Sequence, residues 1–548
     1  MTVPTTGSQL EPARLTESYL SADTGVSLSD LTVGGLLAAR AAEHPDRLAL
    51  VGVRHNTGET DRLTYARLYE EACRVATGLS RMARPGDMVA LWAPNVVEWP
   101  IIEYGAALAG VTLVALNPVL RQSELEYALS HSGSTVLLHA SQSRDYHLAD
   151  VVEQIRASFP ELVTIDLKQT DIWCPADVDP EVIASAPTDP DSPVMLQYTS
   201  GTTGRPKGVL LRHRSLVNNA HLTMRAVEAR EGAVCVNPLP MFHTAACVIG
   251  TLGPCWIGGT EILVDRFVPG PVLDTLREER ATVLFYVPAV LGALLEAQAA
   301  STEAAPQLDV VMGGASNVPA TMIEAAETTF GATVINLFGQ TELAPVLSTT
   351  RPGDTRRDQL ETVGHPLPQV DCKVVDPATG AVLPLGTSGE ICARGPQQLI
   401  CYLHDEEATL ATIDAEGFVH TGDLGSMDER GYLTVTGRLK ELIIRGGENI
   451  SPAVVETALV AHPEVAEAVV VGLPDDRWGE VVAALVRTKG DPAVDLRERL
   501  EAFAREHLAP YQVPARWFLS GDLPVTPTGK VRKFKAVEQV LSGAFREL

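Results

Sequence analysis

Residues Met88–Leu116, MVALWAPNVVEWPIIEYGAALAGVTLVAL, predict two buried strands joined by a helix. The apolar runs Met88–Trp92 and Val111–Leu116 have the length of strands, and Val96–Leu108 between them has the length of a helix. Strands that alternate with helices in this way are typical of β-α-β units and a largely parallel sheet. The segment therefore places the chain in the α/β class.

The same alternation continues along the chain. Short apolar or β-branched runs predict further strands at 134–139, 162–167, 194–198, 282–287, 308–312 and 333–337. After Gly364 the pattern changes, because short strands follow one another with Gly, Pro and Asp turns between them. These strands, at Asp371–Val375, Gly389–Arg394 and Tyr432–Thr436, indicate an antiparallel portion.

The last part of the chain has its own set of elements. Helices are predicted at Pro452–Ala461 and Leu496–His507, and strands at Val465–Val471 and Val481–Arg487. Together they predict a small α+β domain that begins near Lys440. We therefore expect a polar N-terminal extension at 1–30, a large domain at 31–439 and a small domain at 440–548.

The composition describes a globular chain that does not bind polyanions as its main task. Its 548 residues correspond to roughly three to four domain-sized units. The chain has 69 Asp and Glu residues and 43 Lys and Arg residues, which gives a net charge of −26. This charge argues against DNA, RNA or an anionic membrane as the main partner. The eight cysteines form no CxxC pair, residues 1–15 do not resemble a signal peptide, and Pro254 interrupts the longest uncharged apolar stretch. We expect a cytoplasmic protein without a membrane span.

Residues Tyr198–Val209, YTSGTTGRPKGV, have the composition of a phosphate-binding loop. Three glycines let the backbone turn tightly, the hydroxyls can donate to phosphate oxygens, and two cations can offset phosphate charge. The loop contains neither a Walker Gly-Lys-Ser/Thr nor the GxGxxG spacing of dinucleotide sites. We expect it to follow a strand, to precede a helical stretch and to bind an anion. Its candidate binding residues are Thr199, Ser200, Gly201, Thr202, Thr203, Gly204 and Lys207.

This loop resembles the signature of the adenylate-forming ligases, which include acyl-CoA synthetases, peptide-synthetase adenylation domains and firefly luciferases. Further motifs follow in the family's order, namely PMFHT (240–244), NLFGQTE (336–342), TGD (421–423), GRLKELIIRGGENISP (437–452) and PTGK (527–530). The resemblance covers the chain from the end of the polar extension onward. It is strongest to acyl-CoA synthetases that act on fatty or aromatic carboxylates.

The resemblance implies a fold and a two-step reaction. The large domain would contain two doubly wound αβ subdomains and a β-barrel, and the small α+β domain would be mobile. A carboxylate would attack the α-phosphate of ATP to give an acyl-adenylate and pyrophosphate, and the thiol of CoA would then accept the acyl group. ATP, Mg²⁺ and CoA are the cofactors and substrates that this reaction implies.

The resemblance also assigns nucleotide-binding residues to the NLFGQTE motif. Thr341 would contact the α-phosphate, and Glu342 would bind Mg²⁺, a hard cation that prefers carboxylate oxygens. Asn336 would bind the adenine amino group, and Phe338, where relatives often carry Tyr, would stack on the ring. Gly339 belongs to the same motif.

Two other segments complete the implied nucleotide site. The turn Gly313-Gly314-Ala315 would form the other face of the adenine site, since small residues permit close approach. Asp423 of the TGD motif would accept both ribose hydroxyls, with Arg438 beside it.

The PMFHT motif implies the acyl pocket. The aromatic–histidine pair Phe242 and His243 would gate the pocket, and Ala245, Val248 and Gly313 would line it. A histidine in an apolar stretch is more often a packed core residue than a catalyst, so both interpretations of His243 stay open.

The small domain is expected to serve both half-reactions. Lys530 of PTGK would bridge the carboxylate and the phosphate and stabilise the charge that shifts in the transition state. The domain would then rotate about a hinge at Lys440 and present the loop Arg445-Gly446-Gly447 to the thiol. The implied catalytic residues are therefore Lys530, Thr341, Glu342 and His243. Arg212, Arg214 and Lys207 belong to a segment without Asp or Glu that we expect to meet ATP.

Several alternatives remain at this stage. The acceptor could be a carrier-protein thiol, an amine, or nitrite for diazotisation of an aromatic amine, and a homodimer or a carrier protein are the expected protein partners. A noncatalytic nucleotide-binding relative is the alternative of another class. Cys401-Tyr402 replaces the usual Gly-Tyr, so the local backbone there is expected to differ from that of most relatives.

Overall fold

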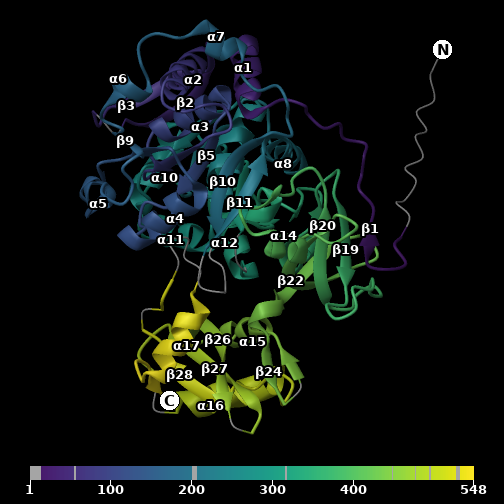
Figure 1. Cartoon of the computed structure of the whole chain (residues 1–548). Coiled ribbons are helices and arrows are strands. Elements are labelled where there is room, and N and C mark those ends of the chain that lie inside the picture. The colour runs from purple at the N-terminus through teal and green to yellow at the C-terminus, as the bar shows by residue number, and fades with distance from the viewer. Residues whose placement is uncertain are drawn as a thin grey trace, which may run out of the picture.

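The predicted β-α-β unit of Met88–Leu116 is present in the first of two large sheets (Figure 1). Strands β4 (Met88–Trp92) and β5 (Thr112–Leu116) pair in parallel, and α3 (Glu98–Ala109) connects them. The helix ends at Gly110, whose φ of 72° is left-handed and whose N–H donates to carbonyls of the last turn. The computed structural model describes residues 14–54, 57–199, 206–314, 318–446, 448–475, 477–492, 495–521, 523–525 and 531–548.

The first sheet has seven strands in the order β21-β11-β10-β5-β4-β6-β9. The strands from β10 to β9 pair in parallel, whereas β11 and β21 are antiparallel additions. Besides β4 and β5, the strands are β6 (Val136–His139), β9 (Val163–Asp166), β10 (Pro193–Thr199), β11 (Lys207–Arg212) and β21 (Cys401–Tyr402).

The second sheet has nine strands in the order β18-β17-β16-β15-β14-β12-β13-β2-β3. The strands from β16 to β2 pair in parallel, and the strands at both edges are antiparallel. They are β2 (Leu48–Val53), β3 (Thr60–Thr64), β12 (Val234–Asn237), β13 (Thr260–Leu263), β14 (Val283–Tyr286), β15 (Val310–Gly314), β16 (Thr333–Phe338), β17 (Ser348–Thr349) and β18 (His365–Pro366).

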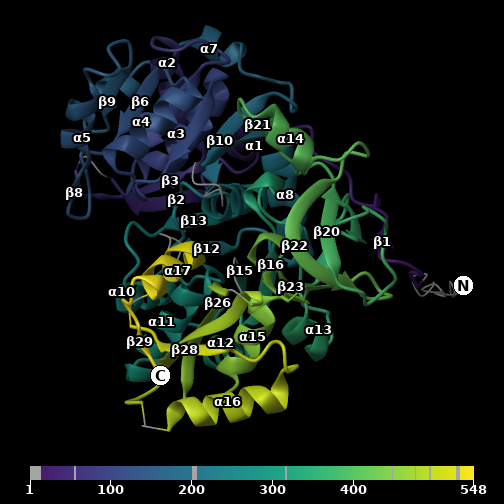
Figure 2. The ribbon, with the colours of Figure 1, turned by 60° about the horizontal axis from the view of Figure 1, so that its bottom comes forward.

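Helices connect the strands of both sheets and cover them, as expected of doubly wound subdomains (Figures 1 and 2). The longer ones are α1 (Val33–Glu43), α2 (Tyr65–Ser80), α4 (Gln122–Ser132), α5 (Leu148–Ile155), α8 (His213–Ala226), π-helix η1 (Ala245–Leu252), α10 (Pro269–Glu278), α11 (Pro288–Ala300) and α12 (Ala320–Phe330). In the part of the chain that the structure describes, no helix combines the length and the apolar character needed to cross a membrane.

One prediction about the phosphate loop is wrong. Residues 200–205 lie outside the described residues, but the segments on either side form a β-hairpin in which Tyr198 pairs with Gly208 and Thr199 with Lys207. The apolar run after the loop is a strand and not the start of a helix, because it completes the sheet between β10 and β21 and buries Val209 and Leu211 fully. Helix α8 begins only after β11, so its N-terminus does not follow the loop directly.

The third sheet of the large domain has five antiparallel strands and lies where the resemblance implied a β-barrel. Its order is β1-β19-β20-β22-β23, and its first strand, β1 (Tyr19–Leu20), comes from the N-terminal extension. Tyr19 pairs with Lys373, so a segment without predicted periodicity joins a sheet formed much later in the sequence. The other strands are β19 (Asp371–Val375), β20 (Gly389–Arg394), β22 (Val419–Met427) and β23 (Leu433–Arg438).

The small C-terminal domain follows the short helix η3 (Leu439–Glu441) and forms a separate lobe (Figure 1). Its predicted elements are confirmed, and helix α16 (Leu496–His507) has the predicted bounds. In both figures α16 lies on the side away from the large domain, and α17 (Lys533–Leu541) lies on the side toward it. The other elements are β24 (Ile443–Arg445), β25 (Glu448–Ile450), α15 (Pro452–Val460), β26 (Val465–Asp475), β27 (Gly479–Thr488), β28 (Arg516–Leu519) and β29 (Arg546–Glu547).

Helix α3 lies between the two large sheets and carries a buried acid. Every residue of α3 is buried, and Glu103 on this helix interacts with Glu261 on β13 of the second sheet. Burial raises the pKa of Glu261 to about 8, although Asn237 and Thr251 donate hydrogen bonds to its Oε1 at 2.9 and 3.1 Å. Burial likewise raises the pKa of Glu103, so both carboxyls favour the neutral form in the folded protein.

Glu261 is expected to make the folded protein less stable as pH rises. The unfolded chain releases this proton near pH 4.5 and the folded protein keeps it to about pH 8, so the free energy of unfolding falls between these values. Glu261→Gln keeps an oxygen acceptor for Asn237 and Thr251 but cannot ionise. We expect a shallower fall in this variant, measured by urea denaturation at a series of pH values.

The matched control is Glu429→Gln, which changes an exposed carboxyl on the surface. It should keep the wild-type slope. A Glu261→Gln protein whose stability falls with pH as steeply as the wild type would contradict this interpretation.

Candidate active site

Several candidate site residues of the large domain lie at or after the carboxyl ends of parallel strands. Thr199 ends β10, Gly314 ends β15 and Phe338 ends β16. The PMFHT motif follows β12 in the same sheet as β15 and β16. Loops at this edge of parallel sheets form the usual ligand crevice of open α/β folds.

Tyr402 joins the end of the phosphate loop to the NLFGQTE motif. Its hydroxyl donates to Glu342 Oε1 at 2.7 Å, and Lys207 Nζ lies 4.6 Å from the centre of its ring. Burial and the neighbouring Glu342 raise the pKa of Tyr402, so its hydroxyl stays protonated and remains a donor. Lys207, Tyr402 and Glu342 therefore form one connected group at the point where we expect phosphates to bind.

The backbone around Glu342 is fixed from two sides. Glu342 lies in the short 3₁₀ helix η2 (Thr341–Leu343), and its carbonyl accepts from the Leu399 N–H at 2.9 Å. Buried Asn219 on α8 donates to the carbonyls of Leu343 and Val346 at 3.2 and 2.7 Å. These bonds hold η2 in place, so the carboxylate of Glu342, 9% exposed, has a defined direction.

The glycines of the adenine segment are required by the protein's own backbone. A Cβ on Gly313 would lie 1.9 Å from the Tyr286 carbonyl oxygen, and one on Gly314 would lie 2.1 Å from that of Leu337. A Cβ on Gly339 would likewise lie 2.0 Å from the Pro345 carbonyl oxygen. The small residues thus let neighbouring strands and the η2 loop approach closely, in addition to the expected approach of a ligand.

Asn336 and Phe338 lie in the last three residues of strand β16. The Asn336 N–H donates to Thr350 Oγ1 at 2.9 Å, and Phe338 pairs with Ser348 of β17. Both side chains are half-buried, which suits residues that border a ligand site at a strand end.

Asp423 and Arg438 face each other across two strands of the third sheet. They are directly paired in the register of β22 and β23, and Arg438 Nε lies 2.8 Å from Asp423 Oδ1. The aspartate is 3% exposed, while half of the arginine side chain is exposed. The structure therefore presents a fixed carboxylate with a guanidinium beside it.

The PMFHT motif is tied to the strand that leads into the phosphate loop. The Thr244 N–H donates to Oε1 of buried Gln197 on β10 at 2.9 Å. The rings of Phe242 and His243 lie 4.3 Å apart, with His243 half-buried. Ala245 begins η1, where Val248 is fully buried. The motif is thus packed and ordered by Gln197, which sequence reasoning did not single out.

The described C-terminal candidates lie within η3 and after it. Lys440 is exposed within η3, and the neighbouring Glu441 pairs with Lys533 of α17 at 3.1 Å. Arg445 donates to the Tyr511 carbonyl at 2.8 Å. Gly446 has a φ of 60°, and a Cβ there would lie 2.7 Å from the Trp478 ring, so only glycine fits this position without rearrangement.

Some predicted site residues fall outside the residues that the structure describes. They are Ser200, Gly201, Thr202, Thr203, Gly204, Ala315, Gly447 and Lys530.

Two cations of the segment without acids have acidic partners from elsewhere. Arg214 pairs with Asp191 at 2.9 Å and with Asp30 at 2.8 Å, and Arg212 lies 3.6 Å from Asp191. Absence of Asp and Glu within a segment therefore did not mean absence of acids around it. Of the cations named for this segment, Lys207 is the one that the structure places in the Tyr402–Glu342 group.

Cys401 does not disturb the backbone. It pairs with Leu210 in the antiparallel ladder of β21 and β11, so it is in extended backbone that any residue adopts. The glycine usual in relatives is not required here. The next residue, Tyr402, donates to Glu342, and its signal in the sequence was its position beside this departure.

Two family models match the chain in the order of its domains. The model described as AMP-binding enzyme matches residues 37–403, and the model described as AMP-binding enzyme C-terminal domain matches residues 454–530. The chain belongs to the AMP-binding enzyme family.

Relatives and solved structures agree with this assignment. A putative acyl-CoA synthetase of Bacillus subtilis, YngI, is 34% identical over 93% of this chain and 97% of that protein. The mitochondrial medium-chain acyl-CoA ligase ACSF2 of Bos taurus is 32% identical over 95% of this chain and 90% of that protein. The Bacillus subtilis o-succinylbenzoate CoA synthetase MenE, solved with its acyl-adenylate, is 29% identical with a TM-score of 0.78, over 91% of this chain and 97% of that one.

This AMP-binding enzyme is an AMP-forming ligase of the acyl-CoA synthetase type. It uses ATP to activate a carboxylic acid as an acyl-adenylate with release of pyrophosphate, and it transfers the acyl group to CoA. The assignment favours an enzyme over the noncatalytic relative that the sequence left open.

Tyr402→Phe removes the hydrogen bond to Glu342 and keeps the ring under Lys207. Because a hydrogen bond to a charged group contributes about 1.5–3 kcal/mol, we expect kcat/KM for ATP to fall about tenfold or more, measured by pyrophosphate release. Tyr432→Phe is the matched control, since the Tyr432 hydroxyl donates to the Asp354 carboxylate at 2.5 Å elsewhere in the large domain. A Tyr402→Phe enzyme that resembles this control would show that Tyr402 does not support the site.

Proposed function

We propose that the nucleotide binds between the strand ends of the large domain and the Asp423–Arg438 pair. The observation that carries this proposal is the connected group Lys207–Tyr402–Glu342, which links the end of the phosphate loop to the NLFGQTE motif. Thr341 and Lys207 would contact phosphate oxygens. Asn336 and Phe338 would bind adenine, and Asp423 would accept the ribose hydroxyls.

Mg²⁺ is the proposed metal, and Glu342 is its proposed ligand. A carboxylate has two oxygens, so Glu342 Oε2 can bind a cation while Oε1 accepts from Tyr402. Carboxylate oxygens suit a hard cation. When bound, Mg²⁺ would offset the negative charge of the phosphates.

The proposed acid is apolar, fatty or aromatic, and of medium size. Phe242, Ala245 and Val248 carry no charge, and the π-helix η1 reads AACVIGTL without an ionisable group other than its cysteine thiol. A charged acyl chain would lose its hydration in such surroundings without gaining a partner. Relatives whose names specify medium-chain acids or anthranilate support this class.

A panel experiment tests both the acid and the acceptor. Pyrophosphate release is measured with apolar, charged and aromatic acids, and each acid is offered either CoA or an amine as the acceptor. In a separate reaction nitrite replaces the acid. The products are identified by mass spectrometry. We expect turnover with apolar acids and acyl-CoA as the product. Adenylation without transfer to CoA would favour a carrier protein or an amine as the acceptor.

The reducing cytoplasm remains the proposed compartment. All eight cysteines are free thiols, and seven of them are buried. Free thiols are typical of reducing compartments.

Lys530 is proposed to serve adenylation alone. Lys530→Ala should abolish pyrophosphate exchange, because no cation would bridge the two anionic groups, and should spare thioester formation from supplied acyl-adenylate. Lys535→Ala changes an exposed lysine five residues later in the sequence, and as the control it should retain both activities. Pyrophosphate exchange that survives in Lys530→Ala would contradict this role.

Lys440 is proposed as the hinge of the small domain. Lys440→Pro fixes φ within η3, so we expect it to slow transfer to CoA selectively and to leave adenylation near the wild-type rate. Lys440→Ala keeps backbone freedom and should retain both steps in the same single-turnover assays. Equal losses in both steps of the proline variant would count against a hinge at this position.

A further inference from the structure

The strand that carries Asp423 contains a β-bulge at the TGD motif. In the pairing of β20 with β22, Cys392 faces His420 and Glu390 faces Leu424. Residues 421–423 therefore face the single residue Ile391. Bulges bend a strand and redirect side chains, and they are frequent beside active sites. Here the bulge ends at Asp423, which is paired with Arg438 on the other side.

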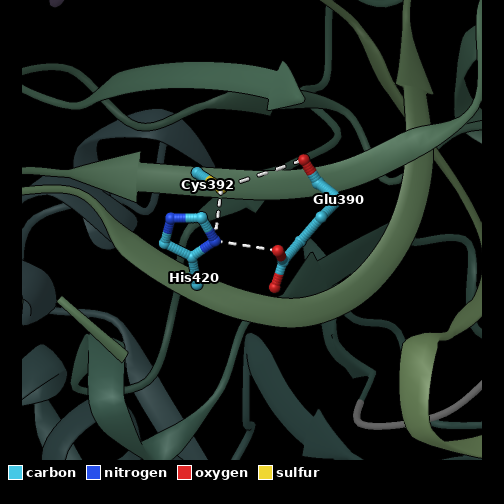
Figure 3. A group of neighbouring side chains, drawn as sticks. All are labelled: Glu390, Cys392 and His420. Carbon is cyan, nitrogen blue, oxygen red and sulfur yellow. Dashed lines mark hydrogen bonds and ion pairs between the residues drawn. The ribbon is translucent and has the colours of Figure 1, made fainter. Parts of the chain in front are cut away.

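The carboxylate of Glu390 completes this bulge. Its Oε1 accepts from the Gly422 N–H at 3.0 Å, and its Oε2 lies 2.8 Å from His420 Nδ1 (Figure 3). Gly422 has a left-handed φ of 71°, and it has no partner in the register of β20 with β22. Glu390 is 7% exposed and Gly422 is half-buried, so loss of this carboxylate would leave the Gly422 N–H without its acceptor in a partly dehydrated position.

The rest of the bulge is held by Thr421. Its Oγ1 donates to the Ile391 carbonyl at 2.7 Å and accepts from the Asp423 N–H at 3.0 Å. The backbone of Asp423 is therefore fixed by Thr421, and the residue before it is fixed by Glu390. These bonds hold the backbone at Asp423, and the ion pair with Arg438 holds its carboxylate.

His420 lies among groups of both charges. Glu390 and Cys392 face it from β20, Asp414 Oδ2 lies 3.6 Å from its Nε2, and Lys373 of β19 lies beyond, paired with Asp414 and Glu416. The hydrogen bond to Glu390 raises the pKa of His420 above its ordinary value, with burial and Lys373 opposing. The contact with Glu390 therefore favours the protonated form of His420.

We propose that Glu390 and His420 form a positioning pair that holds residues 421–423 in the conformation that binds the ribose. The proposal rests on the proposed contact of Asp423 with the ribose hydroxyls. Neither Glu390 nor His420 touches the nucleotide. They act through the Gly422 N–H and thereby through the direction of the Asp423 carboxylate.

The pair predicts a pH dependence with a definite sign. Because the pKa of His420 is raised in the folded protein, the ionic contact with Glu390 is fully present below the ordinary pKa of histidine and is lost as pH rises through the raised value. The KM for ATP of the wild type should therefore rise on the alkaline side. A variant without the Glu390 charge should lack this rise.

A metal site is the competing interpretation of the same side chains. Glu390, Cys392 and His420 offer ligand atoms within 4.8 Å of one another. The 2.8 Å contact between Glu390 and His420 has the length of a hydrogen bond, however, whereas two ligands of one tetrahedral zinc ion lie about 3.3 Å or more apart. The geometry therefore favours an ion pair.

The test compares ATP with 2′-deoxy-ATP in full-length variants. The wild type should use 2′-deoxy-ATP with a KM about tenfold higher, because one hydroxyl contact with Asp423 is lost. Glu390→Ala should raise the KM for ATP about tenfold with kcat within about twofold, and should reduce the discrimination between the two nucleotides. Glu390→Gln keeps an oxygen for the Gly422 N–H and should restore most of the affinity, but without the alkaline rise in KM.

Two controls separate the possible results. Asp371→Asn removes a comparable ion pair, with Arg394, in the same sheet and should leave both KM values unchanged. Cys392→Ser should also leave them unchanged, and metal analysis of the purified protein should find no equimolar ion that depends on Cys392.

Each contrary result has a distinct meaning. A wild type that does not discriminate against 2′-deoxy-ATP would overturn the ribose role of Asp423, and with it this proposal. If the wild type and the Glu390→Ala enzyme discriminate equally between ATP and 2′-deoxy-ATP, the positioning pair alone is overturned. An equimolar metal lost in Cys392→Ser would replace the ion pair by a metal site.

Discussion

Parallel pairing of β14, β15 and β16 is the constraint on which the site depends. Strands that run in the same direction end at the same edge, so Gly314 and Phe338 are brought together with the loop that follows β16. The pairing is close enough that Gly313 and Gly314 cannot carry a Cβ without meeting the carbonyls of the neighbouring strands. The glycines are therefore required by the close packing of the strands, and any space for adenine at this edge results from that packing.

The first and third sheets contribute the other candidate nucleotide-binding residues. From the first sheet, Lys207 and Tyr402 reach Glu342 through a ring contact and a hydrogen bond. From the third sheet, a bulge in β22 directs Asp423 toward Arg438. A nucleotide held by all three sheets would contact residues far apart in the sequence, and this explains why the binding motifs are spread over most of the chain.

Much of the fold could be predicted because apolar runs of strand length can be recognised from the local sequence alone. The strands around Met88–Leu116 and helix α16 follow the pattern within a residue or two. The strand after the phosphate loop was missed because the run Val209–Leu211 is apolar in either interpretation, and only its pairing with β10 and β21 decides between strand and helix. Strand β1 was missed because its two residues pair only with β19, which follows far along the chain.

The motif residues could be named from the sequence, but their supporting residues could not. Gln197 and Glu390 make contacts between elements, and such contacts leave no local signal in the sequence, whereas Tyr402 was marked only by its place beside Cys401. Hydrogen–deuterium exchange with bound AMP tests the account most directly. We predict protection both in residues 333–343 and in residues 419–438 at saturating AMP. Protection confined to the first of these segments would contradict the claim that the third sheet completes the nucleotide site.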